Sequence, residues 1–137
     1  GLFSRRGFNI FSLAVAPTDD SSRSRISIVV DVHNTDATQI AKQLDKLVNV
    51  LDIKELKPGL SVEQELMLAR VRASDAEAVR HIIDDFGGSI ADSNEQELIV
   101  SVHAHPNELD RCETALHEFG IVELQRTGRI ALGHLDG

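Results

Sequence analysis

The chain of 137 residues contains no tryptophan or tyrosine and only one cysteine. A single cysteine excludes an internal disulfide framework and fits a reducing compartment. No apolar run approaches the roughly 18 residues that a membrane-spanning helix needs. Arg5 and Arg6 interrupt the apolar stretch at the start, which argues against a signal peptide. The composition therefore predicts a cytoplasmic chain without a membrane segment.

Groups that mark a catalytic or metal site are also scarce. The adjacent carboxylates Asp19–Asp20 and Asp84–Asp85 fit a turn and a helix surface better than an acid–base pair, which needs shifted pKa values in a cleft. His103 and His105 lie two residues apart and give a weak metal signal, for which surface histidines are the simpler interpretation. Cys112 falls on an apolar helical stripe and is expected in the core. These features favour a protein without catalysis.

Charge is divided unevenly along a chain whose net charge is −8. Residues 1–60 carry eight Lys or Arg against seven Asp or Glu, whereas residues 61–137 carry six against fifteen. A phosphate backbone would be repelled by the second half, so the charge argues against nucleic acid as a partner. The contrast between the halves supports a division into two domains.

The second half predicts the order strand, helix, strand, strand, helix, strand. The expected elements are a strand at 62–73, a helix opened by a capping box of Ser74 and Glu77, strands at 89–91 and 98–102, a helix from Pro106, and a strand at 121–126. Gly87–Gly88 and Gly120 are expected to end the two helices. This order is the split βαβ, or ferredoxin-like, unit.

The first half predicts the same order without its leading strand. The expected elements are a helix end capped by Gly7, strands at 8–16 and 26–32 joined by a polar loop, a helix from Asp36, and a strand at 50–56. A leading strand in this topology pairs on both sides, so we expect roughly a dozen or more residues before Gly1 in the natural protein. A break at 57–59 separates a domain at 1–57 from one at 61–137. The predicted fold class is α+β, with two ferredoxin-like (βαββαβ) domains.

Six segments of the chain resemble the regulatory (small) subunits of acetolactate synthase, also called acetohydroxyacid synthase. They read GLFSRRGFNI, SLAVAPTDD, SRISIVV and QIAKQLDKLVNVLDI in the first half, and ELML (65–68) and VELQRTG (122–128) in the second. The resemblance spans nearly the whole chain and is densest in the first 60 residues. Between 73 and 120 it depends on topology more than on motif.

The resemblance implies that the first domain is an ACT domain, a small-molecule sensor, and that the chain has no catalytic site or cofactor of its own. Such subunits bind a large catalytic subunit that carries thiamine diphosphate, magnesium and FAD. They raise its activity and confer feedback inhibition by valine, in the biosynthesis of branched-chain amino acids. The resemblance also implies a homodimer formed through the ACT domains, with the effector at their interface.

The resemblance places half of the effector site on a turn of this chain, at Gly7, Phe8, Asn9 and Ile10, with Gln39 as a further residue near the site. The chemistry agrees, because an amino acid needs acceptors, donors and an apolar socket. The Asn9 amide can donate and accept, and Ile10 can line the socket. The family's other element, a glycine-containing loop after the leading strand, is absent here, which leaves open whether this chain binds valine by itself.

Two other functions remain open from the residues alone. One is a free-standing ACT-type module that binds an amino acid and controls another enzyme or regulator. The other is a small ferredoxin-like enzyme that uses His103, His105 and nearby carboxylates. Without the resemblance, Asn9 is most simply a turn or edge-strand residue, and Arg5 and Arg6 form a solvated helix end rather than a contact with the large subunit.

Overall fold

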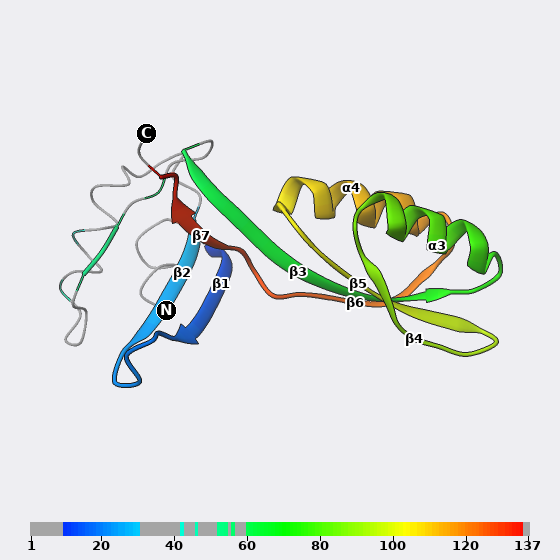
Figure 1. Ribbon diagram of the computed structural model, residues 1–137, viewed down its shortest axis with the longest axis horizontal. Helices are drawn as coiled ribbons and strands as arrows, with labels where there is room; N and C mark the ends of the chain where they lie inside the picture. Colours follow the sequence, from blue (N-terminus) through cyan, green and yellow to red (C-terminus); the bar gives the residue numbers. More distant parts are fainter. Residues whose placement is uncertain are drawn as a thin grey trace. The chain divides into compact units, whose positions relative to one another are not determined.

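The computed structural model describes residues 10–30, 42, 46, 52–54, 56 and 60–135. Its elements are β1 (Ile10–Pro17), β2 (Ser24–Val30), β3 (Ser61–Arg72), α3 (Ala76–Asp85), β4 (Ser89–Ser93), β5 (Glu97–Ala104), α4 (Pro106–His117), β6 (Ile121–Arg126) and β7 (Ile130–Gly133) (Figure 1). The chain divides into a first unit, Gly1–Val62 with Ala131–Gly137, and a second unit, Glu63–Ile130. The predicted α+β class is confirmed.

The described part of the first unit is built on the antiparallel hairpin of β1 and β2, in which Val15 lies opposite Ile26. Its loop is closed by Asp20, whose carboxylate accepts hydrogen bonds from the hydroxyl (2.7 Å) and the backbone N–H (3.0 Å) of Ser22. These two bonds stabilise the charged form and lower the pKa of Asp20. Within the described residues, the two predicted strands and the polar loop are confirmed, with β1 ending at Pro17 rather than at Ala16 and β2 beginning at Ser24 rather than at Ile26. The predicted strand positions 8, 9, 31 and 32 lie outside the described residues.

Of the other predictions for the first half, two fall outside the described residues and one is wrong. The helix end at Gly7 and the start of the helix at Asp36 lie outside the described residues. The strand predicted at 50–56 is wrong at the positions described, because residues 52–54 and 56 belong to no strand. Asp52 and Lys54 are exposed and Ile53 is half-buried, so the alternation is present. A strand also needs a partner for its backbone, and β1 and β2 pair only with each other among the described strands.

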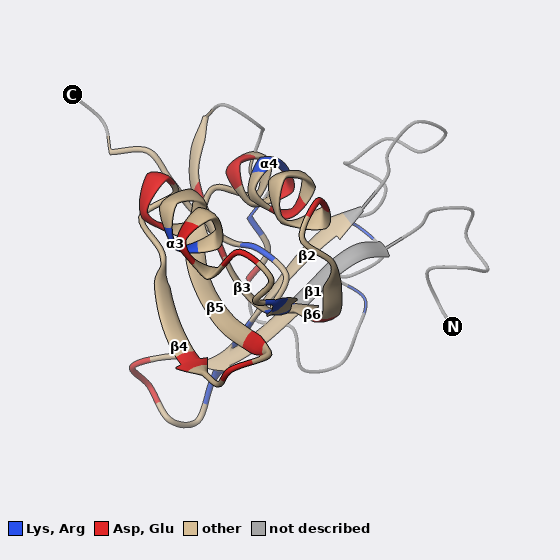
Figure 2. Cartoon of the chain, turned by 90° about the vertical axis from the view of Figure 1, so that its right-hand side faces the viewer, with Lys and Arg blue, Asp and Glu red and all other residues tan. Residues whose placement is uncertain are grey.

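The second unit is a sheet in the order β4-β5-β3-β6 with two helices, α3 and α4, over one face (Figure 2). The first strand of the unit, β3, lies inside the sheet and pairs antiparallel with β5 and with β6, and it also pairs with β7. This is the predicted split βαβ order. Alternate residues of the strands face the helices, and the core is formed by Met67, Ala69, Val71, Val79, Ile83, Leu98, Val100, Val102, Leu109, Cys112 and Leu116.

The helix ends follow local chemistry, with one correction to the sequence analysis. The N-cap of α3 is Asp75, whose carboxylate accepts from the backbone N–H of Ala78 at 3.1 Å, so the predicted capping box of Ser74 and Glu77 is wrong. An aspartate caps as well as a serine, and Glu77 instead lies in the first turn, at the positive end of the helix dipole. Gly87 ends α3 at φ +72°, as predicted.

Cys112 is fully buried in α4, as predicted, and burial together with the charge of Glu113 raises its pKa to about 11. A thiol in this state is an inert core group rather than a nucleophile. Within the described part of the chain, every helix is too short or too polar to span a bilayer.

Candidate functional site

The predicted effector residues lie almost entirely outside the described part of the chain. Gly7, Phe8, Asn9 and Gln39 are not described. Ile10 is the first residue of β1, and its backbone is in register with Val30. The effector site at this turn therefore stays a prediction.

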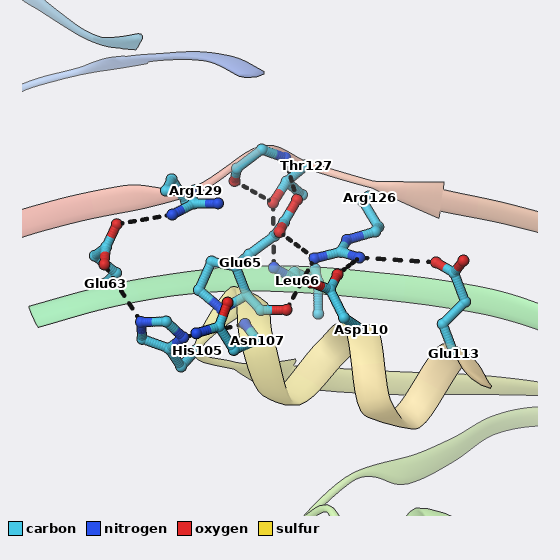
Figure 3. Close-up of polar contacts among 12 residues, drawn as sticks. Glu63, Glu65, Leu66, His105, Asn107, Asp110, Glu113, Arg126, Thr127 and Arg129 are labelled. Carbon is cyan, nitrogen blue, oxygen red and sulfur yellow. Dashed lines mark hydrogen bonds and ion pairs between the residues drawn. The ribbon is translucent and has the colours of Figure 1, made fainter. Parts of the chain in front are cut away.

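The described residues instead bring together a charged group in the second unit, which we call the Arg126 cluster. Its members are Glu63, Glu65, His105, Asp110, Glu113, Arg126, Thr127 and Arg129 (Figure 3). They come from the start of β3, from α4 and its N-cap His105, and from the segment that begins at the end of β6.

Arg126, the last residue of β6, is the centre of the cluster. Its guanidinium donates to Glu65 at 2.7 Å, to Asp110 at 2.6 Å and to the carbonyl oxygen of Pro106 at 3.3 Å. Glu113 lies 3.7 Å away. Burial by itself lowers the pKa of Arg126, but the hydrogen bonds to Glu65 and Asp110 outweigh it, and the pKa is raised. The cation is thus held in place by a strand on one side and a helix on the other.

Glu65 carries the second set of contacts. Its side chain is only 9% exposed, and its other oxygen accepts from the backbone N–H of Gly128 at 2.9 Å. Beside it, the Thr127 N–H donates to the carbonyl of Leu66 at 3.0 Å, and the Leu66 N–H donates to the Thr127 hydroxyl at 3.1 Å. The segment after β6 is therefore bonded to β3 by one backbone hydrogen bond and by the side chains of Glu65 and Thr127.

Glu63 forms the third set of contacts, with Arg129 at 3.0 Å and with Nε2 of His105 at 3.3 Å. Nδ1 of His105 caps α4 by accepting from the backbone N–H of Asn107 at 3.1 Å. Because Nδ1 accepts, the hydrogen of the neutral ring lies on Nε2, which faces Glu63. His105 thus joins a helix end to a strand.

The geometry gives this cluster a structural role. Its carboxylates are satisfied by arginines, backbone N–H groups and a histidine within the same unit. No group of three or more His, Cys, Asp or Glu in the described residues could hold a metal ion. His103 is exposed and in register with Leu66 in the sheet, whereas His105 caps a helix, so the two have separate surroundings.

The sequence analysis did not predict the Arg126 cluster, although two of the segments that form it had already been quoted. The segments ELML and VELQRTG had both been set apart by their resemblance to one family. In a split βαβ unit the first and last strands are neighbours, so Glu65 and Arg126 could have been placed side by side.

Comparison with known proteins finds family models that match both halves of the chain. A family model described as the small subunit of acetolactate synthase matches residues 64–134, and one described as the AHAS small subunit-like ACT domain matches residues 1–52. The chain belongs to the acetolactate synthase small-subunit family. The predicted domain boundary at 57–61 lies between the two matched regions and stays a prediction.

Individual members of the acetolactate synthase small-subunit family match over nearly the whole chain. The acetolactate synthase small subunit of Mycolicibacterium smegmatis is 40% identical, over 96% of this chain and 78% of its own length. The isozyme 3 small subunit of Salmonella typhimurium is 40% identical over 99% and 85%. The chloroplastic small subunit 2 of Arabidopsis thaliana is also 40% identical over 96% of this chain, which spans only 28% of that protein.

A solved member of the family shares the fold. The crystal structure of the small subunit from Thermotoga maritima matches with a TM-score of 0.90 and 29% identity, over 99% of this chain and 86% of that chain. The predicted resemblance and fold class are thereby confirmed.

Proposed function

We propose that this chain is the regulatory subunit of an acetolactate synthase, which activates the catalytic subunit and makes it sensitive to valine. The observation that carries the proposal is the match of two family models, an ACT domain and a small-subunit domain, to successive parts of one chain. A free-standing ACT module would need only the first part. The match at 64–134 therefore favours a subunit of acetolactate synthase over that alternative.

The catalytic subunit is the partner that the relatives' names imply, because a small subunit requires a large one. In this proposal the large subunit holds thiamine diphosphate, magnesium and FAD, and condenses two molecules of pyruvate or one each of pyruvate and 2-ketobutyrate. This chain contributes binding and regulation alone. The satisfied charges of the Arg126 cluster and the inert thiol of Cys112 agree with such a role.

The effector site of the proposal is the turn at residues 7–10, completed by a second copy of the chain. Asn9 and neighbouring backbone N–H groups would meet the ammonium and carboxylate of valine, while Ile10 would line its side-chain socket. Gln39 would lie close to that socket. One methylene in an apolar socket changes binding by only about 1–3 kcal/mol, so leucine and isoleucine should also inhibit at higher concentration.

The decisive experiment mixes the chain with the catalytic subunit from the same organism and measures acetolactate formation from pyruvate, with and without valine. The chain should raise the rate, and saturating valine should lower it, with an effect in the range of about 5–150-fold that typical coupling energies give. The chain alone should form no acetolactate. If the chain changes neither the rate nor its response to valine, the proposal is wrong.

A variant pair tests the site itself. Asn9→Ala should weaken the valine response while leaving activation in place. Asn107→Ala is the matched control, because it removes the same amide from an exposed position on α4. Equal valine responses in the two variants would exclude Asn9 from the site.

A further inference from the structure

The first turn of α4 depends on one side chain to satisfy its backbone. Its first residue, Pro106, has no N–H, and the N–H groups of Glu108 and Leu109 donate to the backbone carbonyl of the N-cap at 2.9 and 3.1 Å. The remaining donor is the N–H of Asn107, which bonds to Nδ1 of the N-cap residue, His105, at 3.1 Å. The imidazole therefore occupies the place of the serine, asparagine or aspartate oxygen that usually caps a helix.

An imidazole differs from those oxygens because it can accept a hydrogen bond only while Nδ1 carries no proton. In the neutral ring of His105 the hydrogen lies on Nε2, which faces the carboxylate of Glu63 at 3.3 Å. A further proton can bind only at Nδ1, and the charged ring is then a donor at both nitrogens. Two donors would face each other between Nδ1 and the N–H of Asn107, so protonation removes the cap.

Charged groups from β3, from α4 and from the segment after β6 lie near the ring. Glu63, on β3, is only 12% exposed and also binds Arg129 at 3.0 Å (Figure 3). Glu108 lies in the first turn of α4 and pairs with Arg111. Arg126 donates to carboxylates of the cluster and to a carbonyl oxygen of α4. A protonated ring is attracted by Glu63 and repelled by the positive end of the helix dipole, so it should keep the strand contact and leave the helix.

We propose that His105 is a pH-sensitive cap, which holds the first turn of α4 while its ring is neutral and releases that turn when the ring takes up a proton. Histidine is the side chain that ordinarily changes its charge between about pH 5 and pH 8, whereas serine and asparagine caps keep their acceptor throughout that range. The cap, the helix and the strand all belong to the second unit, and the inference does not depend on the proposed function.

The protonation state of the ring is measured first, by NMR of the full chain. Proton–nitrogen correlation spectra of the His105 imidazole at about pH 8 should show an unprotonated Nδ1 and a protonated Nε2. The lower pH is the one at which the same spectra show both nitrogens largely protonated, about pH 5.8 for an ordinary histidine. A proton on Nδ1 at the higher pH would overturn the proposal, because such a ring cannot accept from Asn107.

The cap itself is measured by amide hydrogen exchange at Asn107, expressed relative to the intrinsic exchange rate at the same pH. Protection should fall by about 2–30-fold from the higher pH to the lower, which is the factor that loss of a helix cap gives. Ala78 is the internal reference, because its N–H donates to an oxygen of Asp75, which remains an acceptor at both pH values. Constant protection at Ala78 separates the release of one helix end from unfolding of the whole unit.

Three variants complete the test. His105→Asn should remove the pH dependence, because an asparagine oxygen caps a helix and does not titrate. His105→Ala should show the low protection at Asn107 at both pH values. His103→Asn is the matched control, since His103 is exposed on β5 and lies in the strand rather than at the helix end, and it should behave as the wild type.

Two results would refute the pH-sensitive cap. One is equal protection at Asn107 at the two pH values in the wild type, or a fall of the same size in His105→Asn. The other is a fall at Ala78 that matches the fall at Asn107, because the unit would then loosen as a whole.

Discussion

Replacing Arg126 by methionine should destabilise the second unit far more than the same change at Arg70. Methionine keeps most of the apolar stem and removes the guanidinium. At Arg126 this deletes hydrogen bonds of 2.7 Å to Glu65 and 2.6 Å to Asp110. Glu65, only 9% exposed, is left with the N–H of Gly128 as its partner.

The expected loss of stability at each arginine depends on how exposed its side chain is. Removing one partner of a buried ion pair costs about 3–5 kcal/mol, because a charge is left without compensation. Arg126 retains 22% of its exposure, so the cost should fall to about 2–4 kcal/mol. Arg70 is 42% exposed and lies 3.5 Å from Glu123 and 3.9 Å from Glu97, which places its contribution at about 0–1 kcal/mol.

The assay has to report on the second unit alone. The chain has no tryptophan or tyrosine, but Cys112 is its single cysteine and is buried in that unit. Pulsed alkylation of Cys112 across a urea series therefore gives the unfolding midpoint of the unit. With a slope of about 1.5 kcal/mol per molar urea, Arg126→Met should lower the midpoint by about 1.3–2.7 M, and Arg70→Met by less than about 0.7 M. Equal shifts for the two variants would refute the reasoning from burial.

Two further predictions concern single positions in the second unit. Gly88→Ala should destabilise by about 1–3 kcal/mol or more, because the new Cβ would lie 2.7 Å from the backbone oxygen of Ser101. Gly87→Ala, with open space but φ +72°, should cost only about 1–2 kcal/mol, and thermal unfolding showing the reverse order would contradict this. For Cys112, burial and the nearby charge of Glu113 raise the pKa of the thiol in the folded state from 9.0 to about 11. The protonated, buried thiol therefore contributes fully to the stability of the folded state below pH 9.0, and this contribution is lost as the pH rises to about 11. Urea midpoints should thus fall more steeply over this range in the wild type than in Cys112→Ala, and parallel curves would contradict the burial of the thiol.

Local patterns predicted most of the second unit. The apolar residues of α3 and α4 recur at helical spacing, Pro106 and Gly87 mark helix limits, and each of these signals acts within a few residues along the chain. The capping box was placed one residue too early because Ser74 and Asp75 are both good caps, and sequence alone cannot rank two adjacent candidates.

Pairing between distant segments was harder to predict. The alternation at 50–56 resembled a strand, but a strand exists only where a second backbone bonds to it. The Arg126 cluster joins residues up to 66 positions apart in the sequence, such as Glu63 and Arg129. The effector residues near Asn9 stay predictions, carried by the resemblance alone.

By itself, the sequence indicated the family through its resemblance to known members. It also determined the order of elements in the second unit and the core position of Cys112, because periodicity and helix-terminating residues are local properties of a chain. Only the tertiary structure decided which charges meet. It placed Glu65, Arg126 and Asp110 within hydrogen-bonding distance by setting β3 between β5 and β6 beneath α4. The energy of an ion pair depends on separation and solvation, and both arise only when the chain has folded.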